Sequence, residues 1–300
     1  MRTFTCMTML TVCLVFGSWA QAMGPGPGGG MTSEERLGHF LYCDTNLSNP
    51  PGQSCASCHH PMAAFADPDS DLPVSEGVIP GRFGGRNSPT AAYAAYSPVF
   101  HFDEVEGLWI GGQFWDGRAA TLEEQAKGPF LNPAEMNNTK EGVIQAVRQS
   151  AYASLFKSVY GKKSLTNVET AYDLVAKAIA AFERTQMLNK FSSKYDAYLK
   201  GQATLTAQES RGLALFNDPA KGNCAACHPS TSADGVTPPL FTDFSYDNLG
   251  MPKSMEYPFD IMNLPVDIGL GLLRCVFSGA VGWITFFVGL EISKVLMGNE

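Results

Sequence analysis

The chain has 300 residues, of which 45% are apolar and 17% are charged, so it is long enough and apolar enough to bury the core of a globular protein with two domains. Its formal net charge at pH 7 is −8. Because no run of Lys and Arg offsets this acidity, a basic surface for nucleic acid is not expected.

The first 22 residues are predicted to be a cleaved export signal. Arg2 gives a short positive region, residues 7–19 are mostly apolar, and Ala20-Gln21-Ala22 supplies small residues for cleavage. A membrane anchor is the alternative, but the apolar run is short and a Gly/Pro-rich linker follows at residues 23–30. We therefore expect a periplasmic protein whose mature chain begins near Met23.

Two predicted helices begin with the same capping signal. Thr32 and Glu35 have the spacing of a capping box, and apolar residues then recur at helical spacing. Thr206 and Glu209 repeat this spacing ahead of a second apolar stretch. Each of these helices precedes a Cys-rich motif, which indicates one module used twice.

The remaining sequence indicates further helices joined by long loops. Residues 61–112 are rich in Pro, Gly and Asp, which predicts long structured loops of the kind that often contain functional residues. Helical periodicity returns over residues 141–160 and 168–188, and Gly201 predicts the end of a helix over residues 195–200. No convincing series of strands is found, so the predicted fold is all-α with long loops.

Two Cys-x-x-Cys-His motifs give the strongest chemical signal in the sequence. In this spacing two thiols bond the vinyl groups of a haem and the adjacent His binds the iron from one side. A zinc site that pools both motifs, a redox dithiol and a disulfide are the alternatives, but a His directly after both copies favours haem. Two covalently bound haem c groups are predicted, at Cys55, Cys58 and His59 and at Cys224, Cys227 and His228.

The ligand on the second face of each iron decides between electron transfer and catalysis, because an open position admits peroxide. His60 adjoins the first iron ligand and cannot easily reach the opposite face. His39 is expected to be packed or solvated on its helix, and His101 lies in a loop as a candidate ligand. The first haem is therefore predicted to be open. Cys43 and Cys275 are left over and are interpreted as buried or tail thiols.

Further motifs lie between and beside the Cys motifs. They occupy residues 86–90, 113–125, 128–129, 135–136 and 178–185. Because of these motifs, the chain from about residue 37 to residue 249 resembles the bacterial di-haem cytochrome c peroxidases and the related enzyme that matures methylamine dehydrogenase. The resemblance implies two cytochrome c-like haem domains, a peroxidatic domain over residues 31–190 and an incomplete electron-transfer domain over residues 191–273.

The resemblance also implies residue roles. Trp115 would lie between the haems and help electrons cross, and Gln125 and Glu135 would line the peroxide pocket of the first haem. Chemistry agrees for Glu135, because heterolytic cleavage of an O–O bond requires a proton to move between the two oxygens. Without the resemblance, Glu135 would be interpreted as a surface group and Trp115 as a core residue. Asn87 matches a position that helps to bind calcium between the domains, although an Asn also suits the turn before Pro89.

The sequence departs from the family pattern after the second motif. The segment that would supply the other ligand of the second iron, Met in peroxidases or Tyr in the maturing enzyme, is not found. Met251, Met255 and Met262 lie nearby but do not match its position. Residues 274–300 form a divergent apolar tail, for which a truncated or frameshifted sequence is favoured over a short membrane segment.

The sequence thus predicts a cytochrome c peroxidase that reduces hydrogen peroxide to water with electrons from a small redox protein, a cytochrome c or a cupredoxin. The missing ligand segment implies that this activity is impaired. An oxidase that matures a protein-derived cofactor and a non-catalytic di-haem electron carrier are the alternatives. A homodimer is a candidate assembly.

Overall fold

The computed structural model describes residues 30–247 and 254–262. The predicted export signal, nearly all of the linker, Met251, Cys275 and the divergent tail lie outside these residues. Across the described residues, no helix is both long and apolar enough to cross a membrane.

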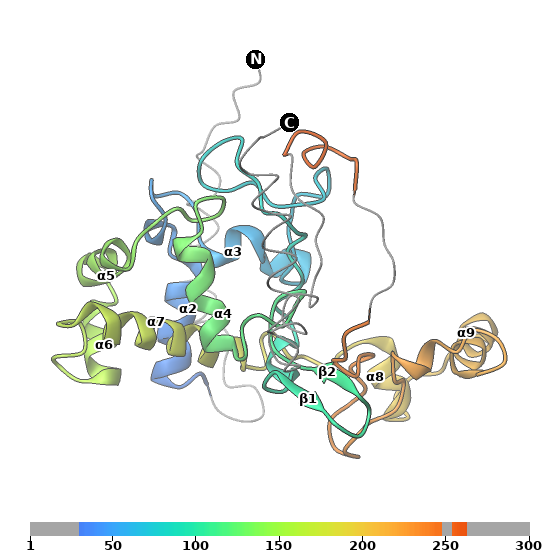
Figure 1. The fold of residues 1–300 in the computed structure, drawn as a ribbon. Coiled ribbons are helices and arrows are strands. Elements are labelled where there is room, and N and C mark those ends of the chain that lie inside the picture. Colours follow the sequence, from blue (N-terminus) through green and yellow to red (C-terminus); the bar gives the residue numbers. More distant parts are fainter. Residues whose placement is uncertain (1–29, 248–253, 263–300) are drawn as a thin grey trace, which may run out of the picture.

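A helical core is built around α7. This helix packs against α2, α4 and α5, and α6 packs against α2 and α5 (Figure 1). The contacts bury large side chains that include Leu37, Leu41, Ile144 and Phe182. The five helices are α2 (Ser33–Cys43), α4 (Leu122–Leu131), α5 (Lys140–Gln149), α6 (Ala153–Tyr160) and α7 (Val168–Glu183).

The contact between α2 and α7 requires a glycine. An added Cβ at Gly38 of α2 would meet the carbonyl oxygen of Ala178, on α7, at 1.8 Å. The predicted start of α2 is confirmed, since the helix begins with the capping box of Thr32 and Glu35. The helix predicted over residues 168–188 ends earlier, at Glu183, and α4 was not predicted. The single helix predicted over residues 141–160 is wrong, because Ser150 caps α5 and a new helix begins at Ala153.

A short hairpin interrupts the otherwise helical and irregular fold. Strands β1 (His101–Asp103) and β2 (Leu108–Ile110) pair antiparallel with Phe102 opposite Trp109. The sequence showed no series of strands, and this single pair was not predicted. Strands of three residues are too short to give a readable alternation, and the ring of Phe100 stacks on Trp109 at a centroid distance of 4.8 Å.

The segment over residues 191–247, which contains the second Cys motif, lies beside the hairpin and away from the helical core (Figure 1). It contains α8 (Lys194–Leu199) and α9 (Ala207–Asn217), and both begin with complete capping boxes. A β-bridge between Ile110 and Ser245 joins it to β2. The backbone N–H of Gly111 also donates to the carbonyl of Phe244 at 2.9 Å.

Candidate functional site

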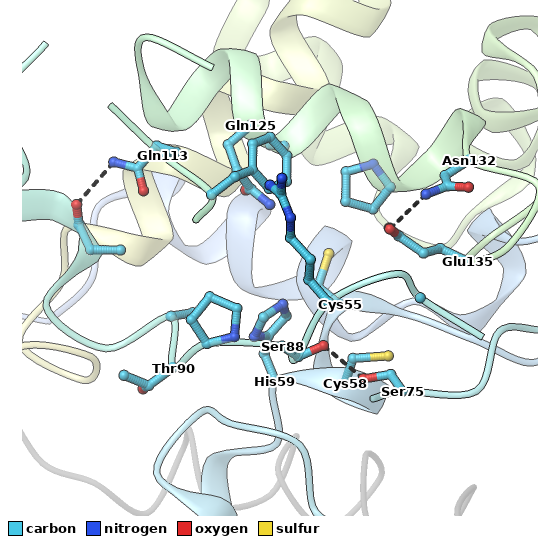
Figure 2. A pocket seen from close by; sticks show the side chains of 18 of the residues that line it. Cys55, Cys58, His59, Ser75, Ser88, Thr90, Gln113, Gln125, Asn132 and Glu135 are labelled. Carbon is cyan, nitrogen blue, oxygen red and sulfur yellow. Dashed lines mark hydrogen bonds between the residues drawn. The ribbon is translucent and has the colours of Figure 1, made fainter. Parts of the chain in front are cut away.

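A cavity of about 600 Å³ lies against the helical core. One wall holds the first Cys motif, which forms the single turn α3 (Cys55–Cys58) followed by His59. Figure 2 shows Gln125 and Glu135 on the other side of this cavity. The structure therefore brings together, from distant parts of the chain, groups that the sequence marked separately.

The two thiols of the first motif are both reduced and partly buried. Burial raises the pKa of the Cys55 thiol far above its usual range, and burial raises the pKa of Cys58 to about 11. Both thiols are thus neutral at physiological pH. Among the residues that the structure describes, no group of three or more His, Cys, Asp or Glu side chains is placed to hold a metal ion, so the pooled zinc site gains no support.

The ring of His59 is oriented by its backbone surroundings. Its Nδ1 lies 3.3 Å from the carbonyl oxygen of Phe65. Because a carbonyl can only accept, Nδ1 is the protonated nitrogen and Nε2 is left as the metal-binding nitrogen. Burial lowers the pKa of His59, which favours the neutral imidazole that binds metals.

The second motif repeats this arrangement. Nδ1 of His228 lies 2.8 Å from the carbonyl oxygen of Phe241. Phe65 and Phe241 both have left-handed backbones, with φ of 59° and 54°, and in both cases an Asp follows two residues later. A Phe-x-Asp signal downstream of each motif was present in the sequence and was missed. The repeat of one local module is confirmed at this level.

Glu135 lies just after the end of α4 in a tightly held turn. Its Oε1 accepts a hydrogen bond of 2.7 Å from Nδ2 of Asn132 (Figure 2), while Oδ1 of Asn132 accepts from the N–H of Ala134 at 2.9 Å. These two bonds fix the orientation of the Asn132 amide. Burial raises the pKa of Glu135, and the Asn132 bond and the charge of Arg118 oppose that rise.

A loop from the other side of the site supports this turn. The N–H of Val78 donates to the carbonyl of Glu135 at 2.8 Å. An added Cβ at Gly77 would lie 2.3 Å from the carbonyl oxygen of Ala134, so only glycine allows this approach. The position of Glu135 is thus set by backbone contacts as well as by Asn132.

Trp115 and Asn87 both line the cavity and contact each other. Nε1 of Trp115 donates to the backbone oxygen of Asn87 at 2.7 Å, and 56% of the Trp115 side chain is exposed. Trp115 is therefore not a core residue. Nδ2 of Asn87 donates to the carbonyl of Pro73 at 2.9 Å, and the calcium role of Asn87 stays a prediction.

The remaining histidines lie away from the cavity. His39 stacks near Phe182 at a centroid distance of 5.0 Å, as expected for a packed residue. His60 accepts from the N–H of Met62, and His101 contacts the carbonyl of Val99. In the part of the chain that the structure describes, His59 is thus the one histidine that lines the cavity.

Glu183 was not identified from the sequence as a site residue. It ends α7 on the cavity wall with only 5% of its surface exposed, and its Oε2 has no hydrogen-bond partner among the described residues. Burial raises its pKa to about 8, against the opposing charge of Arg184. The residue lies within the motif at 178–185. However, the sequence of a helix does not show whether a single glutamate on it points into the protein or into solvent.

These features fit a covalently bound haem. The cavity wall offers two neutral thiols and an imidazole whose Nε2 is oriented for iron. Residues 32–204 match the family model described as di-haem cytochrome c peroxidase.

The chain belongs to the di-haem cytochrome c peroxidase family.

Haem c is accordingly the cofactor type that this family membership implies. The methylamine utilization protein MauG of Paracoccus denitrificans (strain Pd 1222) is 40% identical over 221 residues, which cover 72% of this chain and 56% of MauG. Cytochrome c551 peroxidase of Pseudomonas aeruginosa is 34% identical over 204 residues, with 67% and 52% covered. The chain therefore spans about half the length of the curated relatives it matches.

A solved structure is also similar to this member of the family. The diheme peroxidase BthA from Burkholderia thailandensis E264 superposes with a TM-score of 0.74 at 36% sequence identity. The match covers 84% of this chain and 62% of BthA. The mostly helical fold is thus shared with a diheme peroxidase.

Proposed function

We propose that the protein reduces hydrogen peroxide to water with electrons from a small redox protein, a cytochrome c or a cupredoxin. The observation that supports this most is the placement of Glu135 and Gln125 across the cavity from His59. No other histidine among the described residues lines that cavity. A partly buried carboxyl group at this point suits proton transfer, which simple electron carriage does not require.

The two Cys motifs would hold the haems. Cys55 and Cys58 would form the thioether bonds at the first site and His59 Nε2 would bind the iron, with Cys224, Cys227 and His228 in the same roles at the second. When bound, the haem supplies an iron that can bind peroxide and exchange electrons. The partly exposed Trp115 would help electrons to cross between the sites, and Asn87 would contribute to a calcium site between the two haem domains.

Glu135 would move the proton that peroxide cleavage requires. Each peroxide takes up two electrons and two protons and yields two waters, and one proton must pass from the inner to the outer oxygen. Because Nδ2 of Asn132 occupies Oε1, the proton would be exchanged at Oε2 of Glu135. Burial that raises the pKa of Glu135 brings it closer to the range in which a group can both accept and donate a proton.

An oxidase that modifies a partner protein is a second candidate. It is favoured by the 40% identity to MauG, which is described as a methylamine utilization protein. The two activities differ in what supplies the electrons. A peroxidase consumes peroxide only while a reduced cytochrome c or cupredoxin is oxidised, whereas the oxidase takes electrons from side chains of its partner.

The test begins with the full chain expressed in a host that attaches haem c, with two haems verified by mass. Peroxide is then mixed with the protein and the change in the Soret band is timed. Glu135→Gln should slow this change by about 100-fold. Glu141→Gln, on the exposed side of α5, is the matched control and should leave it unchanged. A fully loaded wild type that does not respond to peroxide would contradict the proposal.

We also propose that the protein works in the periplasm. The proposal rests on the apolar leader and on haem motifs of the type that are loaded outside the cytoplasm. Mass analysis of the N-terminus of the mature holoprotein should place it near Met23. An N-terminus that retains residues 1–22 in a haem-loaded protein would contradict cleavage.

A further inference from the structure

A second, smaller cavity adjoins the large one. Its volume is about 350 Å³, against about 600 Å³ for the large cavity. The two cavities share five lining residues, which are Phe114, Arg118, Pro129, Asn132 and Glu135. Because a haem held by the first Cys motif would occupy the large cavity, the small one is the space that stays next to Glu135.

The small cavity runs from the surface to the Glu135 carboxyl group. Arg118, Glu124 and Gly128 lie at its outer end and are exposed, whereas Asn132 and Glu135 lie at its inner end and are partly buried. Helix α4 supplies Glu124 and Gly128 to one wall, and the turn at residues 114–119 supplies the other. The cavity is therefore placed between solvent and the proton-transferring group of the proposed reaction.

The turn that forms the outer wall is held in place by polar contacts. Nη1 of Arg118 lies 2.8 Å from Asp116 Oδ1, and Asp116 also pairs with Arg86 at 2.7 Å. The Arg118 guanidinium lies over the Phe114 ring, 3.6 Å from its centroid. The rim is thus a fixed structure and not a loose loop end.

Gly128 keeps the two walls apart. An added Cβ at this position would lie 3.4 Å from Cζ of Phe114 and would have no other neighbour within 4 Å. A larger side chain at position 128 would consequently extend toward Phe114 across the cavity. The absence of a side chain at Gly128 leaves the space between α4 and the Phe114 ring open.

We propose that the small cavity is the entry vestibule through which hydrogen peroxide and other small polar ligands reach the first iron. This inference rests on the proposed function, because it assigns a route to the same site. Arg118 and Glu124 give the outer end a polar surface suited to a small hydrogen-bonding molecule. Phe114 and Gly128 set the width of the passage.

The test uses the haem-loaded full chain with Gly128→Val, and cyanide and peroxide as probes. Blocking a route slows entry and exit equally, so both the association and the dissociation rate constants of cyanide should fall by about tenfold while Kd stays unchanged. The peroxide-dependent Soret change should slow by a similar factor. Gly212→Val on α9 is the matched control, since no atom lies within 4 Å of a Cβ there.

A second variant that should widen the passage distinguishes a blocked route from a misfolded protein, because misfolding would not speed ligand binding. Phe114→Gly removes one side of the passage, and glycine accepts the backbone φ of 67° at this position. It should speed cyanide binding and release together. Rates that match wild type in both variants, or a weaker Kd with unchanged release, would overturn the vestibule while leaving the peroxidase proposal intact. A wild type that binds neither probe would overturn both.

Discussion

Replacing Glu183 by Gln should remove a large pH dependence of stability. The folded-state pKa of Glu183 is raised to about 8 from an ordinary 4.5 because the group is buried. Between these values the folded protein holds a proton that the unfolded chain has lost, so stability falls as pH rises through this window. From pH 5 to pH 8 the loss is roughly 3 to 4 kcal/mol, because each pH unit in this window costs about 1 kcal/mol or somewhat more until Glu183 begins to ionise near pH 8.

The assay is denaturant unfolding of the haem-loaded wild type and Glu183→Gln at pH 5, 6, 7 and 8. Gln is isosteric and stays neutral, so the variant should gain stability relative to wild type as pH rises. Burial lowers the pKa of His39, and this histidine changes stability with the opposite sign. The difference between the two proteins cancels its contribution. A difference that stays constant from pH 5 to pH 8 would refute an ionisable, uncompensated Glu183.

Three further changes test the site and the fold. Asn132→Ala should move the acidic limb of the peroxide reaction to higher pH, because the Asn132 hydrogen bond lowers the pKa of Glu135 and its loss raises that pKa. The pH dependence of the Soret rate measures this. Gly38→Ala should destabilise the protein by roughly 3 kcal/mol or prevent folding, since its Cβ would overlap the Ala178 carbonyl; thermal unfolding against wild type decides it. Trp115→Phe should slow steady-state turnover with a donor cytochrome and leave the peroxide-dependent Soret change unaltered, and equal slowing of both would argue against a role in electron transfer.

Local signals in the sequence were sufficient for several elements. The capping boxes at Thr32 and Thr206 were predicted and are present, because a cap is a contact between residues three positions apart. The Cys motifs were equally readable, since their spacing is fixed by the geometry of the haem itself. Most of the helical content therefore followed from patterns that lie within one turn of the chain.

The contacts that depend on distant residues could not be predicted. The hairpin is stabilised by aromatic packing around Trp109 and by a bridge from Ile110 to Ser245, which lies far along the chain. The exposure of Trp115 and the inward position of Glu183 likewise depend on how α7 and the loops pack. Neither residue type nor periodicity distinguishes a solvated glutamate from one that a neighbouring helix buries.

The different burial of the two Cys motifs has a consequence for the order in which the cofactors are attached. A sulfur reacts as the thiolate, and burial holds Cys55 and Cys58 as neutral thiols once the helical core has folded. Cys224 and Cys227 stay exposed in the folded chain. We therefore expect haem attachment at the first motif to be faster before the core folds, whereas the second motif stays exposed after that step. The N-terminal haem is thus predicted to be attached before the C-terminal one. Only at the first motif does attachment compete with folding of the helical core.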